Sequence, residues 1–125
     1  KKDGIISNIV KSIKNNKTIT ITHNGNQIRD YLFIDDAVEG IVSAINYKKR
    51  GFNIFNIASG QKYNTKKIIK SIENNFERKL LTKITKDEPD EKCIWVDTSK
   101  AKKILKFETK TDIKMGIKSI KDKIE

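Results

Sequence analysis

Segments with the apolar spacing of an amphipathic helix alternate along this chain with short runs typical of β-strands, and this alternation limits the fold more than any other feature. The helical spacing predicts helices over residues 4–16, 37–45, 64–76, 99–105 and 113–124. Strands are predicted over 18–22, 52–58, 80–85 and 94–96, with an extended segment over 27–34. We therefore expect a mixed α/β fold, with too few strands for a complete doubly wound domain.

The composition is that of one globular domain over residues 1–125, because 36% of the residues are hydrophobic and 34% are charged. No apolar run approaches the roughly 20 residues of a transmembrane helix, and no secretory signal opens the sequence. A single cysteine, Cys93, excludes an intramolecular disulfide. We expect the protein to be cytoplasmic and not to associate with a membrane. The sequence begins with lysine and its one methionine is Met115, so we also expect a fragment of a longer chain.

The net charge of +11 is carried almost entirely by lysine, with 24 lysines against 3 arginines. A basic surface is typical of proteins that bind nucleic acid, so a lysine-rich module for nucleic acid or another polyanion is one hypothesis. Isoleucine and asparagine are also abundant, at 22 and 11 residues, and all three residue types have A/T-rich codons. Proteins that read bases or phosphates rely on arginine. A solvated lysine surface is therefore the favoured interpretation.

Few residues form a pattern that supports chemistry within the chain. His23 is the only histidine and lies beside a turn with no cysteine near it, which argues against a metal site or a Cys–His nucleophile. Tyr63 and Lys67 match the spacing Y-x-x-x-K of short-chain dehydrogenases, but no glycine-rich phosphate loop accompanies them. We interpret Asp36 as an N-terminal helix cap. We therefore predict no catalytic residue, cofactor site or metal site in this chain.

Three stretches stand in the order and at the intervals of one enzyme family. Residues 25–38 read GNQIRDYLFIDDAV, residues 52–60 read FNIFNIASG, and residues 95–105 read WVDTSKAKKIL. Together they resemble the NAD-dependent epimerase/dehydratase family, the extended short-chain dehydrogenases that are UDP-glucose 4-epimerase-like. The resemblance covers about residues 19–107. It implies the C-terminal, nucleotide-sugar-binding portion of such an enzyme, without the Rossmann half.

The resemblance also implies how a UDP- or dTDP-linked sugar is held. Arg29 corresponds to a diphosphate-binding position, with Gln27 beside it. A guanidinium offers two parallel hydrogen bonds that lysine cannot reproduce. From its position alone, Arg29 would instead form a surface ion pair, for example with Asp30. Asp90 corresponds to an acidic residue near the ribose, although an ordinary loop aspartate explains it equally well. The residues implied to meet the base mainly through backbone groups are Thr20, Ile21 and Thr22.

The implied full-length enzyme is an NAD(P)-dependent nucleotide-sugar epimerase or dehydratase that forms a homodimer. This chain alone is expected to bind no cofactor and to be inactive, because the family's glycine-rich loop and catalytic pair belong to the missing half. Three positions depart from the family pattern, since His23, Ala58 and Lys106 each stand where glycine is common. Lys86 stands near the position of a second diphosphate arginine.

Overall fold

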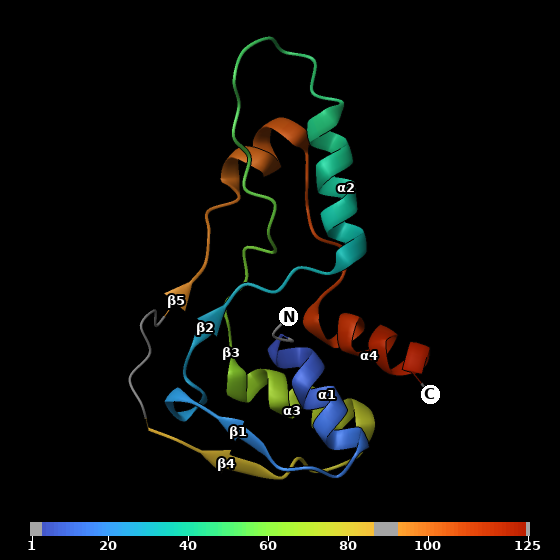
Figure 1. Cartoon of the computed structure of the whole chain (residues 1–125). Coiled ribbons are helices and arrows are strands. Elements are labelled where there is room, and N and C mark those ends of the chain that lie inside the picture. Colours follow the sequence, from blue (N-terminus) through green and yellow to red (C-terminus); the bar gives the residue numbers. More distant parts are fainter. Residues whose placement is uncertain (1–3, 87–92, 125) are drawn as a thin grey trace.

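The computed structural model describes residues 4–86 and 93–124 (Figure 1). In chain order its elements are α1 (Ile5–Lys14), β1 (Ile19–Ile21), the 3₁₀ turn η1 (His23–Gly25), β2 (Ile28–Arg29), α2 (Ile34–Ile45), β3 (Tyr63–Asn64), α3 (Thr65–Phe76), β4 (Thr82–Ile84), β5 (Cys93–Ile94), the π-helical turn η2 (Ala101–Leu105) and α4 (Ile113–Ile124). Helices and very short strands alternate, which confirms the predicted mixed α/β fold.

The strands form two small sheets. In the first, β1 and β4 run parallel, with Ile19 opposite Thr82. In the second, β2 lies between β3, which is antiparallel to it, and β5, which is parallel. Both sheets lie beside the helices α1 and α3 (Figure 1). The connection from β1 to β2 therefore joins one sheet to the other.

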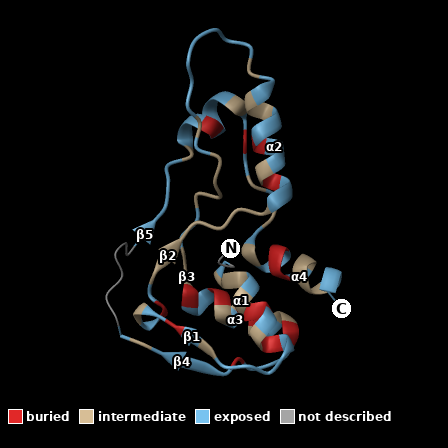
Figure 2. Cartoon of the chain, in the orientation of Figure 1, coloured by how far each residue is buried: buried red, intermediate tan, exposed pale blue. Residues whose placement is uncertain are grey.

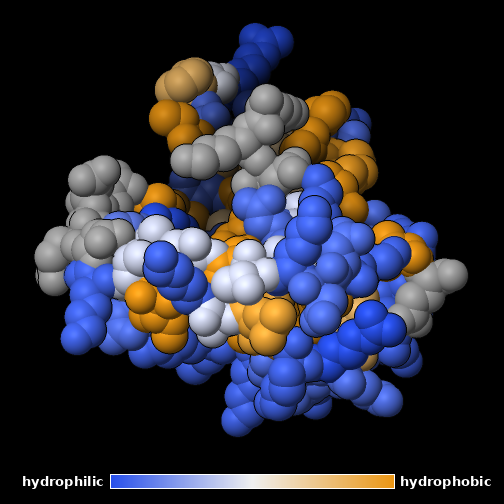
Figure 3. Space-filling model, turned by 60° about the horizontal axis from the view of Figure 1, so that its bottom comes forward, coloured by the Kyte–Doolittle hydropathy of each residue, from blue (hydrophilic) through white to orange (hydrophobic). Residues whose placement is uncertain are grey.

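The main core lies among α1, α3 and α4. Figure 2 shows buried residues on the facing sides of these three helices. The apolar stripes of the sequence form this core, as the helical spacing predicts. Its fully buried side chains are those of Ile9, Ile68, Ile72 and Ile117. Hydrophilic side chains cover most of the surface in the view of Figure 3, in keeping with the lysine content. None of the described helices is long and apolar enough to cross a membrane.

The start of α3 follows the sequence prediction closely. Asn64 precedes the helix, and its side-chain oxygen accepts a hydrogen bond from the backbone N–H of Lys67 at 2.9 Å. This bond satisfies one of the N–H groups that a helix start leaves without a partner. The predicted cap near Asn64 is confirmed.

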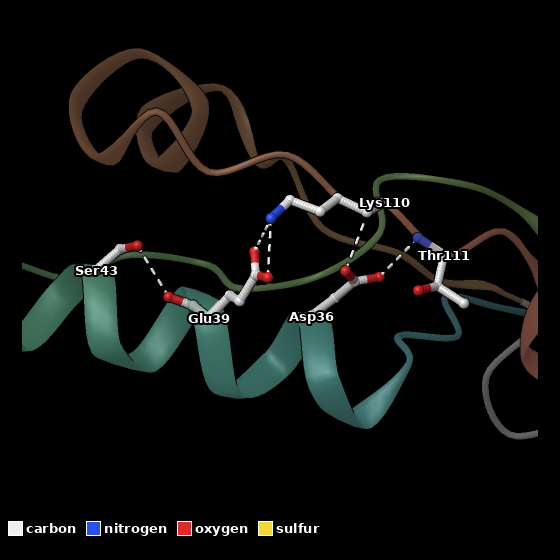
Figure 4. Close-up of polar contacts among 5 residues, drawn as sticks. All are labelled: Asp36, Glu39, Ser43, Lys110 and Thr111. Atoms are coloured by element: carbon white, nitrogen blue, oxygen red, sulfur yellow. Dashed lines mark hydrogen bonds and ion pairs between the residues drawn. The ribbon is translucent and has the colours of Figure 1, made fainter.

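Asp36 does not cap α2, so that prediction is wrong. The helix begins at Ile34, and Asp36 lies inside its first turn with only 3% of its surface exposed. The carboxylate accepts hydrogen bonds from the backbone N–H groups of Lys110 and Thr111, at 3.1 and 3.0 Å (Figure 4). Because the chain that leads into α4 crosses α2 at this point, Asp36 joins two distant segments.

The predicted buried strand over 52–58 is also wrong. The structure assigns no strand there, and Phe52 and Ile54 are 90% and 64% exposed. A strand forms only where a second strand receives its backbone hydrogen bonds. Within residues 4–86 and 93–124, no strand lies beside this segment. The segment therefore has no strand to pair with in the described part, although its apolar composition is typical of a strand.

Candidate functional site

A cavity of about 270 Å³ lies where β1 and β2 meet the starts of α1 and α3. We call it the Arg29 pocket, and its lining residues are Ile5, Thr20, Ile21, Thr22, Gln27, Arg29, Tyr31 and Thr65. The structure thus brings together all of the predicted binding residues except Asp90. Asp90 lies outside the described residues.

One row of side chains forms a wall of the pocket. Gln27, Arg29 and Tyr31 all line it, whereas Ile28 and Asp30 do not. Successive side chains of an extended segment point to opposite faces, so every second residue lies on the same face. The extended segment 27–31 therefore directs an amide, a guanidinium and a phenol toward one cavity.

Asp30 points to the other face and holds a turn. Its two carboxylate oxygens accept hydrogen bonds from the backbone N–H groups of Ser59 and Gly60, at 2.8 and 2.9 Å. The sequence left open an ion pair between Arg29 and Asp30. In the structure, the carboxylate of Asp30 serves the 59–60 turn, and the side chain of Arg29 lines the pocket.

The strand β1 presents an open backbone edge. The N–H of Ile19 donates to the carbonyl of Leu81, and the carbonyl of Ile21 accepts from Thr85, both at 2.9 Å. Alternate residues of a strand direct their backbone groups to opposite edges. The N–H and carbonyl of Thr20 therefore lie at the edge away from β4, which no strand covers in the part of the chain that the structure describes. This edge can hydrogen-bond a planar polar group.

The turn η1 brings β2 back beside β1. His23, Asn24 and Gly25 have positive φ angles of 55°, 52° and 66°. A left-handed residue other than glycine costs about 1 kcal/mol, so His23 adopts at some cost the conformation that glycine takes freely. A Cβ on Gly25 would lie 3.0 Å from Cγ of Lys66 and 3.3 Å from Cγ2 of Ile21. The tight turn at Gly25 is what places Gln27 near Thr22.

Arg29 and Tyr31 set the electrostatics of the pocket. The Nη1 of Arg29 donates to the carbonyl of Ile28 at 2.8 Å, which fixes one end of the guanidinium. Burial raises the pKa of Tyr31 above its ordinary value of 10.0, and the positive charge of Arg29 opposes this shift. The described lining contains one cation and no carboxylate. The arrangement is suited to an anion.

Sequence reasoning missed three lining residues, Ile5, Tyr31 and Thr65. The alternation that selects Gln27 and Arg29 also selects Tyr31 two positions later, so the signal for Tyr31 was present. Ile5 and Thr65 begin α1 and α3, and only the packing of these helices brings them to the pocket. Among the described residues, no cluster of three His, Cys, Asp or Glu side chains forms a metal site.

Comparisons with known proteins agree with the motifs. Residues 1–58 match the model of the NAD dependent epimerase/dehydratase family. The chain is 32% identical over 118 residues to a UDP-glucuronate 4-epimerase from Thermodesulfobacterium geofontis, a match that covers 93% of this chain and 36% of that protein. It is 33% identical over 80 residues to a dTDP-4-dehydro-6-deoxyglucose reductase from Escherichia coli, covering 64% of this chain and 25% of the relative.

The fold gives the same result. The structure of UDP-glucuronic acid 4-epimerase from Bacillus cereus, in complex with UDP-glucuronic acid and NAD, matches with a TM-score of 0.87 and 28% identity. That match covers 96% of this chain and 39% of the other. The chain thus spans little more than a third of the length of these epimerases. By sequence and by fold, the chain matches the NAD-dependent epimerase/dehydratase family.

Proposed function

We propose that this chain is the C-terminal, substrate-binding lobe of an NAD-dependent nucleotide-sugar epimerase or dehydratase, and that the Arg29 pocket holds the nucleotide diphosphate. The observation that carries the proposal is the convergence of Thr20, Gln27 and Arg29 on one cavity in a chain of this family. Relatives of this chain support the ligand class, because the Bacillus cereus enzyme holds UDP-glucuronic acid.

Each part of the pocket suits a part of the ligand. The guanidinium of Arg29 can donate two parallel hydrogen bonds to phosphate oxygens. The open backbone edge at Thr20 offers one donor and one acceptor, which suits the polar edge of a base. The net charge of +11 attracts an anionic ligand over a longer range. Both UDP- and dTDP-linked sugars fit this description. Asp90, beyond the described residues, is our proposed ribose contact.

The remaining part of the enzyme supplies the cofactor site in this proposal. NAD bound there provides the hydride chemistry, and this chain holds the diphosphate so that the sugar reaches it.

The helix α2 has an exposed apolar face that supports a contact with the remaining part of the enzyme. One row of its apolar side chains is about half exposed or more. We call it the α2 row, and it consists of Ile34, Val38, Ile41, Val42 and Ile45. The unpaired segment 52–58, with exposed Phe52 and Ile54, lies in the same upper part of the molecule (Figures 1 and 2). We propose that the Rossmann half covers this surface.

The test compares UDP with UMP in wild type and in Arg29→Lys. The substitution keeps the charge and removes the forked donor, and losing such a contact costs about 1.5–3 kcal/mol. We expect calorimetry to show UDP binding weakened by that amount and UMP binding weakened less. Arg50→Lys, at an exposed arginine after α2, is the matched control and should bind as wild type. Equal weakening of UDP and UMP, or no change in either, would overturn the proposal.

This comparison is best made in the intact enzyme, or in this chain mixed with the missing half. A ligand that sits between two halves gains contacts from both, so binding to the chain alone is expected to be weak. The ratio between the two ligands, rather than either affinity, is therefore the quantity to compare.

A further inference from the structure

Tyr31 completes the row that Gln27 and Arg29 begin. The three residues occupy alternate positions, and all three line the Arg29 pocket. Tyr31 also borders the apolar cavity between α1 and α4. Its electrostatic interaction, however, is with Arg29. The phenol therefore lies between an apolar region and the cationic pocket.

The hydroxyl of Tyr31 receives no hydrogen-bond partner from residues 4–86 and 93–124, although the side chain is half-buried. Its neighbour Tyr63 differs in this respect. The two rings are 6.4 Å apart, and the hydroxyl of Tyr63 donates to the side-chain oxygen of Gln61 at 2.6 Å. The ring of Tyr31 is thus fixed by packing, while its hydroxyl is available to a ligand.

The chemistry of the pocket indicates what such a ligand offers. A tyrosine phenol is protonated at neutral pH, so the hydroxyl of Tyr31 can donate a hydrogen bond. Arg29 beside it is also a hydrogen-bond donor and lines the same pocket. The complementary group is an anion with several acceptor oxygens. A phosphate has this character, and hydrogen bonds from hydroxyls to charged oxygens are short and strong.

We propose that Tyr31 is a further ligand-positioning residue, whose hydroxyl donates to a phosphate oxygen of the diphosphate that Arg29 holds. The inference rests on the proposed function, since it requires a nucleotide diphosphate in the Arg29 pocket. It adds a second donor on the same wall of the pocket. Two donors from one rigid segment would fix the orientation of the phosphate as well as attract its charge.

Tyr31→Phe tests this contact, because it removes one oxygen and keeps the ring that packs against Tyr63. The matched control is Tyr63→Phe, which removes a hydroxyl that is already bonded to Gln61. We expect Tyr31→Phe to weaken UDP binding about tenfold. Tyr63→Phe should bind UDP as wild type does. Equal affinities of wild type and Tyr31→Phe would overturn the inference.

Arg29→Lys, measured alongside, separates the two proposals. If Arg29→Lys weakens UDP binding and Tyr31→Phe does not, the inference about Tyr31 fails and the proposed function stands. If neither variant weakens UDP binding, both fail. Reduced binding by both variants supports both.

A spectroscopic measurement distinguishes a direct contact from a packing effect. The chain has three tyrosines, so labelling the ring carbon that bears the hydroxyl gives three resonances. The Tyr31 resonance is identified by its loss in Tyr31→Phe. Saturation with UDP should shift that resonance more than those of Tyr47 and Tyr63. A Tyr31 resonance that stays unchanged at saturation would overturn the direct contact, even if the variant binds more weakly.

Discussion

The carboxylate of Asp36 accepts a hydrogen bond from the backbone N–H of Thr111 at 3.0 Å, and so joins α2 to a residue 75 positions further along the chain. Asp30 acts in the same way on the turn at Ser59 and Gly60. Two acidic residues of the stretch 25–38 therefore hold distant segments in place. Arg29, from the same stretch, lines the pocket. The stretch thus combines two structural contacts with three residues that line the pocket, Gln27, Arg29 and Tyr31.

Replacing Asp36 with alanine should lower the free energy of unfolding by about 2–3 kcal/mol, because two backbone N–H groups lose a charged acceptor. Asp36→Asn should lose about half as much, since an amide retains one acceptor oxygen. The measurement is urea unfolding followed by circular dichroism. Asp35→Ala is the control, because Asp35 is exposed in the same turn of α2. It should change stability by less than about 0.5 kcal/mol. Full recovery of stability by Asp36→Ser would contradict the account and favour a helix cap.

Lys106→Gly should stabilise the chain by about 1 kcal/mol. Lys106 ends η2 with a φ of 56°, a left-handed conformation that glycine adopts without a steric cost. Thermal unfolding of wild type and variant provides the comparison. Lys103→Gly, inside the same helical turn, should instead destabilise by about 1 kcal/mol. The explanation fails if the two glycine variants shift stability in the same direction.

The two raised tyrosine pKa values predict a loss of stability at high pH. Burial is the main cause of the raised pKa of both Tyr31 and Tyr63, so the folded chain keeps these protons to a higher pH than the unfolded chain does. The resulting stabilisation is fully present below pH 10.0, the ordinary value, and disappears as pH rises through the folded-state pKa. Unfolding in urea across this range should show a smaller alkaline loss in Tyr31→Phe than in wild type. An identical loss in both proteins would show that Tyr31 does not contribute.

The sequence predicts elements that depend on local spacing, and it fails where a distant partner decides. The apolar stripes predict α1, α3 and α4, and Asn64 predicts the start of α3. Both signals are local, because helix caps and apolar helix faces depend on residues that are close in sequence. The segment 52–58 has strand composition but lacks a strand to pair with in the described part. The partner of Asp36 could not be found locally, since 75 residues separate it from Thr111.

The candidate site can likewise be predicted only where neighbouring residues determine it. Gln27 and Arg29 could be predicted from a motif, and the alternation of an extended segment extends this reasoning to Tyr31. Thr65 could not be predicted, because it reaches the pocket through the packing of α3. Local sequence thus identifies one wall of the pocket, and the tertiary fold supplies the others.

The chain alone should not bind NAD with micromolar affinity, because we place the cofactor site in the missing half. Calorimetric titration with NAD checks this directly. Micromolar binding would contradict the assignment of this chain as the substrate lobe.

Mixing the chain with the proposed Rossmann half tests whether the α2 row is the surface by which the two parts associate. A charged side chain within an apolar interface is costly, so Val38→Asp in the α2 row should prevent the two parts from associating. Asn46→Asp, at an exposed position just after α2, should leave association unchanged. Equal association of both variants would show that the α2 row is not the contact surface.

The most direct test of the account is an NMR map of backbone amides during titration of the chain with UDP. The method detects weak binding, so it suits a separated lobe. The account predicts that the shifted amides gather at Thr20, Thr22, Gln27 and Arg29, around the Arg29 pocket. A lysine-rich module for polyanions would behave differently, with shifts spread over the lysine-bearing helix faces and binding that weakens steeply with salt. Shifts of that second kind, or none around Arg29 at saturation, would contradict the assignment of this chain as a nucleotide-diphosphate-binding lobe.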